Sequence, residues 1–210
     1  MRVYKFLDAR FGLKSLCEKR LKISKLDDLN DPFELLPYDI RNKGHRRALY
    51  ATKKELEQNR GLLCFSATWR NPVIWAHYAD KHKGLCLGFE APDDRARQVK
   101  YVSKRLPFPL TPKPANATAM LFTKYRSWSY EREIRIWAEL NDVEDGLYYA
   151  EFGDTLRLVE VIVGARSPLA RSDITLALGP LKNQVTLIKA RAGFTEFEIV
   201  VDRRFLKSGW

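Results

Sequence analysis

Short runs of apolar residues, several of them alternating with small or polar ones, recur along the chain. They predict strands at residues 2–6, 61–66, 85–90, 130–140, 156–164, 185–191 and 197–201, with a short extended piece at 21–24. Between them, amphipathic or charged stretches predict helices at 13–21, 44–60 and 172–181. Helices and strands therefore interleave, which predicts an α+β fold: a single mixed, mainly antiparallel β core flanked by helices.

The clearest helix signals surround residues 71–84. Asn71 can cap the helix, Pro72 suits the first helical position, and Gly84 can stop it after a basic last turn. Trp75, with residues 78 and 79, falls at the spacing of a buried stripe. His77 falls on a neighbouring face, where residue 80 lies three positions further on.

Prolines between residues 105 and 116 interrupt any helical or strand-like repeat of apolar residues. We interpret this stretch as a long surface loop, because neither flank is long enough to fold by itself. The sequence holds no repeat and no low-complexity tract. Residues 1–210 are therefore predicted to form a single domain.

The composition is that of a globular protein, with 45% apolar and 30% charged residues in 210. No run of 18 apolar residues is present, and the first 20 residues carry charges throughout, so we predict neither a spanning helix nor a signal peptide. The three cysteines cannot form a closed set of disulfides. These features predict a cytoplasmic protein without a membrane partner.

The charge balance is strongly basic, with 37 Lys and Arg against 26 Asp and Glu, a formal charge of +11 and a pI near 9.6. A basic surface indicates an anionic partner, either nucleic acid (RNA or DNA) or a phosphorylated small molecule. The alternative is a basic surface that serves only solubility.

Two polar clusters lie in the first 70 residues. Asn30-Asp31-Pro32-Phe33-Glu34 places two acids around a proline, as a loop shaping a polar pocket or as a structural turn. Ser66 ends a predicted strand just before the capped helix, a position where a hydroxyl can hold a phosphate or a ribose.

Two further clusters carry ionisable residues. His77 and His82 share the predicted helix but lie about 140° apart around its axis, which does not favour a simple metal site. In the predicted strand 130–140, a period of two puts Glu131, Glu133 and Arg135 on one face, preceded by aromatic residues. A helix would instead make Glu131 and Arg135 an ordinary i,i+4 pair.

These clusters, in this order, resemble domain-of-unknown-function family 2971 of bacteria. The resemblance covers residues 2–165 and is carried by N-D-P-F-E, L-C-F-S, N-P-x-x-W-x-H-Y-A-D-x-H-x-G and W-x-Y-E-x-E-x-R, after a V-Y-K-F start.

The order of parts is also similar to that of the ADP-ribosyltransferases. That resemblance implies an ADP-ribosyltransferase-like fold and NAD as a substrate. It implies a toxin or phage-defence effector that modifies nucleic acid, with an antitoxin or accessory protein as a further partner. Glu133 and Glu131 match the E-x-E carboxylates, and Ser66 matches the strand-end hydroxyl. The first strand lacks the family's Arg or His, which leaves Lys5 as the nearest basic residue.

The predicted function is therefore an NAD-dependent ADP-ribosyltransferase. Glu133 would stabilise positive charge on the ribose, and Glu131 would orient the nucleophile. The predicted site is completed by His77 and by the NAD-contacting residues Ser66, Arg135, Tyr4, Lys5, Tyr78 and Tyr130. The alternatives are a non-catalytic nucleic-acid-binding domain and a metal-dependent nuclease built from His77, Asp80, Glu131 and Glu133.

Overall fold

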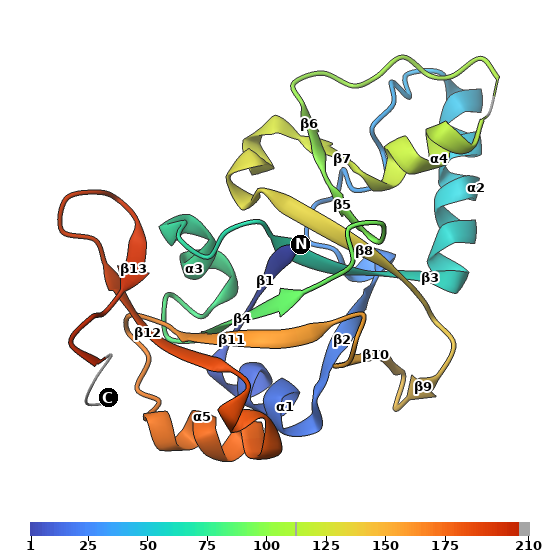
Figure 1. Cartoon of the computed structure of the whole chain (residues 1–210). Helices are drawn as coiled ribbons and strands as arrows, with labels where there is room; N and C mark the ends of the chain where they lie inside the picture. Colours follow the sequence, from blue (N-terminus) through green and yellow to red (C-terminus); the bar gives the residue numbers. More distant parts are fainter. Residues whose placement is uncertain (112, 206–210) are drawn as a thin grey trace. The chain divides into compact units, whose positions relative to one another are not determined.

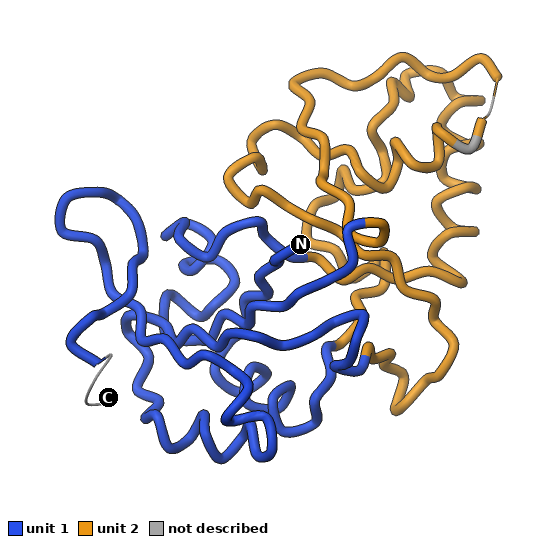
Figure 2. The backbone as a smooth tube through the Cα atoms, viewed as in Figure 1, with its two compact units in different colours: residues 1–21, 65–93, 151–210 blue, residues 22–64, 94–150 orange. Residues whose placement is uncertain are grey.

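The computed structural model describes residues 1–111 and 113–205, in two compact units (Figures 1 and 2). Unit 1 comprises Met1–Leu21, Phe65–Asp93 and Glu151–Trp210, and unit 2 comprises Lys22–Cys64 and Asp94–Ala150. Each unit combines helices with mainly antiparallel strands, so the predicted α+β class is confirmed. Each unit is assembled from segments that are distant in the sequence. The assignment of residues 1–210 to a single domain stays a prediction.

Unit 1 is built on a sheet in the order β13-β12-β11-β4-β1 (Figure 1). The strands are β1 (Arg2–Leu7), β4 (Leu85–Glu90), β11 (Arg157–Val163), β12 (Thr186–Ala192) and β13 (Ile199–Val201). Only β11 and β12 run parallel within this set. The helices of the unit are α1 (Ala9–Glu18), α3 (Pro72–Tyr78) and α5 (Arg171–Leu178), followed by the 3-10 helix η3 (Gly179–Asn183).

The core of unit 1 lies on β4 and α3. Leu85, Leu87 and Phe89 of β4 are fully buried, as is Trp75 of α3. The Trp75 ring meets the Phe6 ring edge to face at 5.1 Å, and its indole N–H donates to the Trp69 carbonyl. The predicted burial of Trp75 is therefore confirmed.

In unit 2, β3 (Arg60–Ser66) pairs with β2 (Arg20–Lys25) and with β8 (Glu133–Glu139), and β8 pairs with β5 (Ala96–Gln98). β10 (Leu147–Glu151) and β9 (Val143–Glu144) extend the β2 side, and β6 (Lys100–Val102) pairs separately with β7 (Thr123–Tyr125). The helices are η1 (Leu26–Asp28), α2 (Lys43–Asn59), α4 (Pro114–Leu121) and η2 (Arg126–Glu131). An apolar cluster that includes Leu35, Leu49, Leu62 and Met120 packs inside this unit.

Two predicted helices begin or end at other residues. α1 begins at Ala9 rather than Leu13, because the Asp8 carboxylate caps it by accepting from the Phe11 N–H. It ends at Glu18, since Lys19 adopts a left-handed conformation with φ 54°. Asn71 caps α3 as predicted, but the helix ends at Tyr78 rather than continuing to Lys83.

The early end of α3 has a local cause. Residues 80–82 all have positive φ, which no helix tolerates, so the predicted i,i+3 relation of His77 and Asp80 on one helix is wrong. The backbone then comes close to the end of β1 at Gly84. A Cβ on Gly84 would overlap the Leu7 carbonyl oxygen, so Gly84 is required by this close approach.

Two other predicted stretches differ from the structure. The strand predicted over 130–140 begins only at Glu133, because residues 126–131 form η2 and Arg132 is left-handed with φ 45°. The predicted loop 105–116 is shorter, since α4 begins at Pro114, where a proline is suited to the first helical turn. Pro112, which belongs to that prediction, lies outside the described residues.

None of the helices in the described part of the chain combines the length and apolar character needed to cross a membrane. Cys17, Cys64 and Cys86 form no disulfide among the described residues.

Candidate functional site

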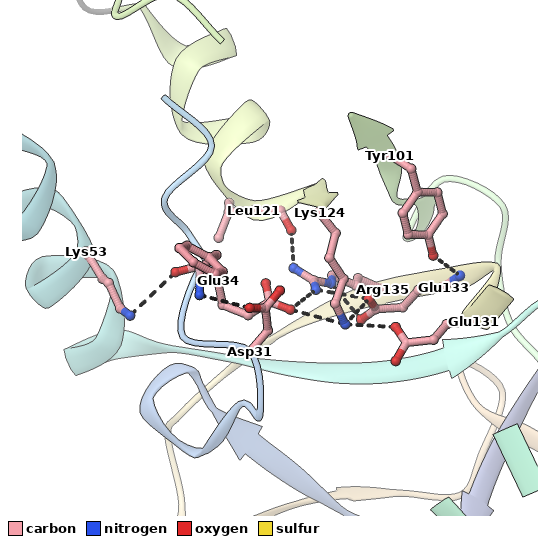
Figure 3. A network of polar contacts seen from close by, with 10 residues as sticks. Asp31, Glu34, Lys53, Tyr101, Leu121, Lys124, Glu131, Glu133 and Arg135 are labelled. Atoms are coloured by element: carbon pink, nitrogen blue, oxygen red, sulfur yellow. Dashed lines mark hydrogen bonds and ion pairs between the residues drawn. The ribbon is translucent and has the colours of Figure 1, made fainter. Parts of the chain in front are cut away.

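A buried network of five charged side chains lies in unit 2 (Figure 3). Three neighbouring segments supply it, namely the turn at 31–36, β7 and the stretch where η2 passes into β8. Its members are Glu34, Lys124, Glu131, Glu133 and Arg135, none of which exposes more than 7% of its surface. Buried charges are tolerated only when they are paired and hydrogen-bonded, and this network meets that condition with an excess of one negative charge.

Arg135 is the centre of the network and is completely buried. Its Nε donates to Glu133 Oε1 at 2.7 Å, and one terminal nitrogen donates to Glu133 Oε2 at 3.0 Å and to Glu34 Oε1 at 2.7 Å. The other terminal nitrogen donates to the Leu121 carbonyl at 2.6 Å. The planar guanidinium thus fixes two carboxylates and the end of α4 at once.

Lys124 of β7 is the second cation and lies among three carboxylates. Its Nζ is 2.8 Å from Glu131, 3.3 Å from Glu133 and 3.4 Å from Glu34. Burial works to lower its pKa, but the three carboxylates outweigh burial and raise the pKa well above its ordinary value. The lysine therefore remains charged.

Glu34 differs from the other two carboxylates. Its Oε1 contacts both cations, whereas its Oε2 is buried and has no hydrogen-bond partner among the described residues. Local structure fixes this arrangement. The Glu34 N–H donates to the Asp31 carbonyl, and the Asp31 Oδ1 accepts from the Phe33 N–H. An anchored carboxylate with one unused oxygen can accept a hydrogen bond from a ligand or stabilise a positive charge.

A pocket of about 340 Å³ opens beside this carboxylate. Asp31 and Glu34 line it, and the unpartnered Asp31 Oδ2 is also buried. Among the described residues, three buried side-chain oxygens lack a hydrogen-bond partner, and two of them belong to residues that line this pocket. The remainder of the wall is aromatic, apolar, basic or hydroxyl-bearing: Phe33, Leu36, Pro37, Val102, Ser103, Lys104, Arg105, Thr123, Lys124 and Tyr125.

The exposed part of the pocket wall offers flat and cationic groups. Phe33 and Tyr125 expose about half of their surface, at 56% and 51%. The Arg105 guanidinium lies over the Phe33 ring at 5.5 Å and donates to the Tyr38 carbonyl. The pocket wall therefore combines two carboxylate side chains with aromatic and basic groups.

The predicted residues of unit 2 are brought together in part. Glu131, Glu133 and Arg135 share the network, as the strand pattern suggested, although Glu131 reaches it from η2 and not from the strand. All three are absent from the pocket wall. The half-buried Tyr130 lies next to Glu131, and burial raises its pKa.

The other predicted residues lie in unit 1. Tyr4 of β1 is directly opposite Ser66, the last residue of β3, so these two are neighbours. Burial raises the pKa of Tyr4 to about 12. Lys5 is half-buried on the same strand, and His77 is exposed near the end of α3, with its ring edge to face against Tyr78. Their catalytic and NAD-binding roles stay predictions.

The sequence pattern did not identify Lys124, because its partners lie on two other segments, the turn at 31–36 and the stretch where η2 passes into β8. It did consider the Asn30–Glu34 stretch as a pocket-shaping loop, and the pocket lining fits that alternative. The described side chains include no group of three or more His, Cys, Asp or Glu residues that could hold a metal ion.

Comparisons of the chain with protein-family models, with curated proteins and with solved structures return no match. The resemblance to domain-of-unknown-function family 2971 stays a prediction.

The network should make the free energy of unfolding depend on pH in the acidic range. Burial opposes ionisation of Glu133, but Arg135 and Lys124 hold its pKa below its ordinary value. A carboxyl group whose pKa is lowered by folding stabilises the protein above its unfolded pKa, and that contribution is lost as the pH falls through the folded value. We expect the free energy of unfolding to decrease as the pH drops below about 4.5. The decrease should be less steep in Glu133→Gln. Chemical denaturation across pH 3–7 measures this. Glu55→Gln, on an exposed face of α2, should keep the wild-type slope, and equal slopes in all three proteins would contradict the account.

Proposed function

We propose that the protein is an NAD-dependent ADP-ribosyltransferase whose nucleotide site is the pocket of unit 2. The observation that carries the proposal is the Glu34 carboxylate, held at Oε1 by two buried cations while Oε2 has no partner among the described residues. Its negative charge is fixed in place before any ligand arrives, which is the property that electrostatic catalysis needs.

The pocket residues fit the chemical parts of a nicotinamide nucleotide. The unpartnered oxygens of Asp31 and Glu34 can accept from ribose hydroxyls, and Lys104 and Arg105 can pair with phosphate. Phe33 and Tyr125 offer ring faces for stacking. A volume of about 340 Å³ lies at the lower end of small-molecule sites, about 300–1,000 Å³. It suits one half of a dinucleotide, with the other half over the open rim.

The chemistry assigned to these residues is electrostatic. Bound NAD supplies an ADP-ribosyl group: the bond from the ribose carbon to nicotinamide breaks, nicotinamide leaves, a new bond to the target nucleophile forms, and the proton of the nucleophile passes to solvent. Glu34 Oε2 faces the positive charge that develops on the ribose and stabilises it. Lys124 and Arg135 hold the Glu34 carboxylate in position through its Oε1, and Glu133, with both oxygens engaged, holds Arg135 in position.

Glu34, rather than Glu133, is here the carboxylate that faces the ribose. The sequence motif gives that role to Glu133, and that assignment stays a prediction. The geometry favours Glu34 because both Glu133 oxygens accept from Arg135 or Lys124, whereas one Glu34 oxygen does not.

The proposed target is nucleic acid, in keeping with the net charge of +11. A cytoplasmic effector that acts as a toxin or in phage defence, with an antitoxin or accessory protein, completes the proposal. It rests on the family resemblance and on three cysteines that form no disulfide among the described residues, rather than on the pocket.

Thermal unfolding with NAD tests the nucleotide site. A ligand that binds only the folded state stabilises it by RT ln(1 + [L]/Kd), so NAD at 100 times Kd should add about 2.7 kcal/mol. The shift should disappear when Arg105 and Lys104 are both replaced by glutamine. NAD that leaves the melting temperature unchanged up to millimolar concentration, or an equal shift in the variant, would contradict the proposed site.

A further inference from the structure

The first three turns of α2 carry a concentrated positive charge. Residues 41–54 contain six Lys and Arg and neither Asp nor Glu. Asn42 caps this helix by accepting from the N–H groups of residues 44 and 45. Leu49 is buried in the apolar cluster of unit 2, which fixes the face that α2 turns inward.

Four residues form one outward stripe on this helix. Lys43, Arg47, Tyr50 and Lys54 are spaced by four, three and four residues, so at 100° per residue they fall within about 60° of one another. All four are exposed, and Tyr50 shows 51% of its surface. At about 1.5 Å per residue the stripe is about 16 Å long.

Helix stability does not explain the position of Lys43, the stripe cation in the first turn of α2. The positive end of the helix macrodipole disfavours cations near the N-terminus and favours acids, yet the first turn of α2 contains no acid. Residues that break such a local rule are expected where function requires them.

We infer that this stripe binds single-stranded nucleic acid. The three cations would pair with backbone phosphates, and Tyr50 between them offers a ring face on which an unpaired base can stack. A duplex would leave the tyrosine without a base face to meet, since its bases are stacked on one another. The inference rests on the proposed function for its class of target, and it names the surface that holds that target.

The stripe belongs to the same unit as the pocket. Lys53, on the inner side of α2, donates to the Glu34 carbonyl at 3.5 Å (Figure 3). A strand bound along α2 would therefore lie near the turn that carries the catalytic carboxylate of the proposed function.

A fluorescent 12-nucleotide unstructured oligonucleotide tests the inference, in the full chain and without NAD. Each phosphate contact in a single strand contributes about 0.7 to the slope of log K against log salt. The variant Lys43→Gln/Arg47→Gln/Lys54→Gln should therefore lose about 2 from that slope. Between 50 and 200 mM salt its affinity should fall about 20-fold less than that of the wild type.

A matched variant removes the effect of net charge. Lys81→Gln/Lys83→Gln/Arg203→Gln deletes three exposed cations of unit 1 and lowers the charge equally. It should keep the wild-type slope. Tyr50→Ala should weaken binding about tenfold at constant slope, and Tyr50→Phe should restore it.

Three results would overturn the inference: equal slopes in the two triple variants, equal affinity for the oligonucleotide and its duplex, or binding to phosphatidylserine vesicles without binding to the oligonucleotide. Because NAD is absent, failure here leaves the nucleotide site untouched, and failure of the NAD shift leaves this test intact.

Discussion

Replacing Glu34 with glutamine should lower the rate of nicotinamide release from NAD about 100- to 1,000-fold, the usual effect of removing one preorganised electrostatic contact to a transition state. The amide keeps the shape of the side chain but carries no negative charge to face the ribose. The fold should persist, because the network then holds two carboxylates and two cations and becomes neutral. Release of labelled nicotinamide under saturating NAD measures the rate.

Two further measurements separate a catalytic effect from a structural one. The melting temperature of Glu34→Gln should stay close to that of the wild type, and NAD should still raise it. Glu55→Gln, an exposed acid on α2, should retain full activity. A Glu34→Gln protein with undiminished turnover would remove Glu34 from the chemistry.

Replacing Arg135 with methionine should cost about 3–5 kcal/mol of unfolding free energy, because it removes one partner from a buried ion-pair network. Glu34, Glu131 and Glu133 would then share a single cation, Lys124, and the Leu121 carbonyl would lose its donor. Denaturant unfolding at neutral pH gives the value.

Arg97→Met is the matched control for this loss. Arg97 lies directly opposite Arg135 across the β5–β8 pair but is exposed, with its guanidinium over the Phe122 ring. Its replacement should cost less than about 1 kcal/mol. Similar losses in the two variants would show that the buried network contributes no more than a surface contact.

The site could be predicted in part because some of its residues are close together in the sequence. Glu133 and Arg135 are two residues apart on one strand, and a period of two places such residues on the same face. The break before that strand could not be predicted from alternation, since it depends on the left-handed backbone of Arg132.

The pairing that makes Glu34 distinctive is long-range. Glu34 and Arg135 are separated by 101 residues, and no local spacing connects a turn to a distant strand. Lys124 could not be predicted for a different reason: β7 is only three residues long and carries no pattern of its own. The predicted helix ends are wrong where capping or backbone conformation sets them. Asp8 caps α1 and makes it begin earlier than predicted, and the positive φ angles after Ala79 make α3 end earlier than predicted.

A crystal structure of the protein with a non-hydrolysable NAD analogue would show whether Glu34 contacts the ribose. The measurement is the distance from Glu34 Oε2 to the nearest ribose oxygen of the bound analogue. We expect this distance to be that of a hydrogen bond, about 2.5–3.0 Å. We also expect the phosphates of the analogue to lie beside Lys104 and Arg105. An analogue bound at saturation away from the turn at residues 31–36, with Glu34 Oε2 in contact only with protein or solvent, would contradict the proposed site.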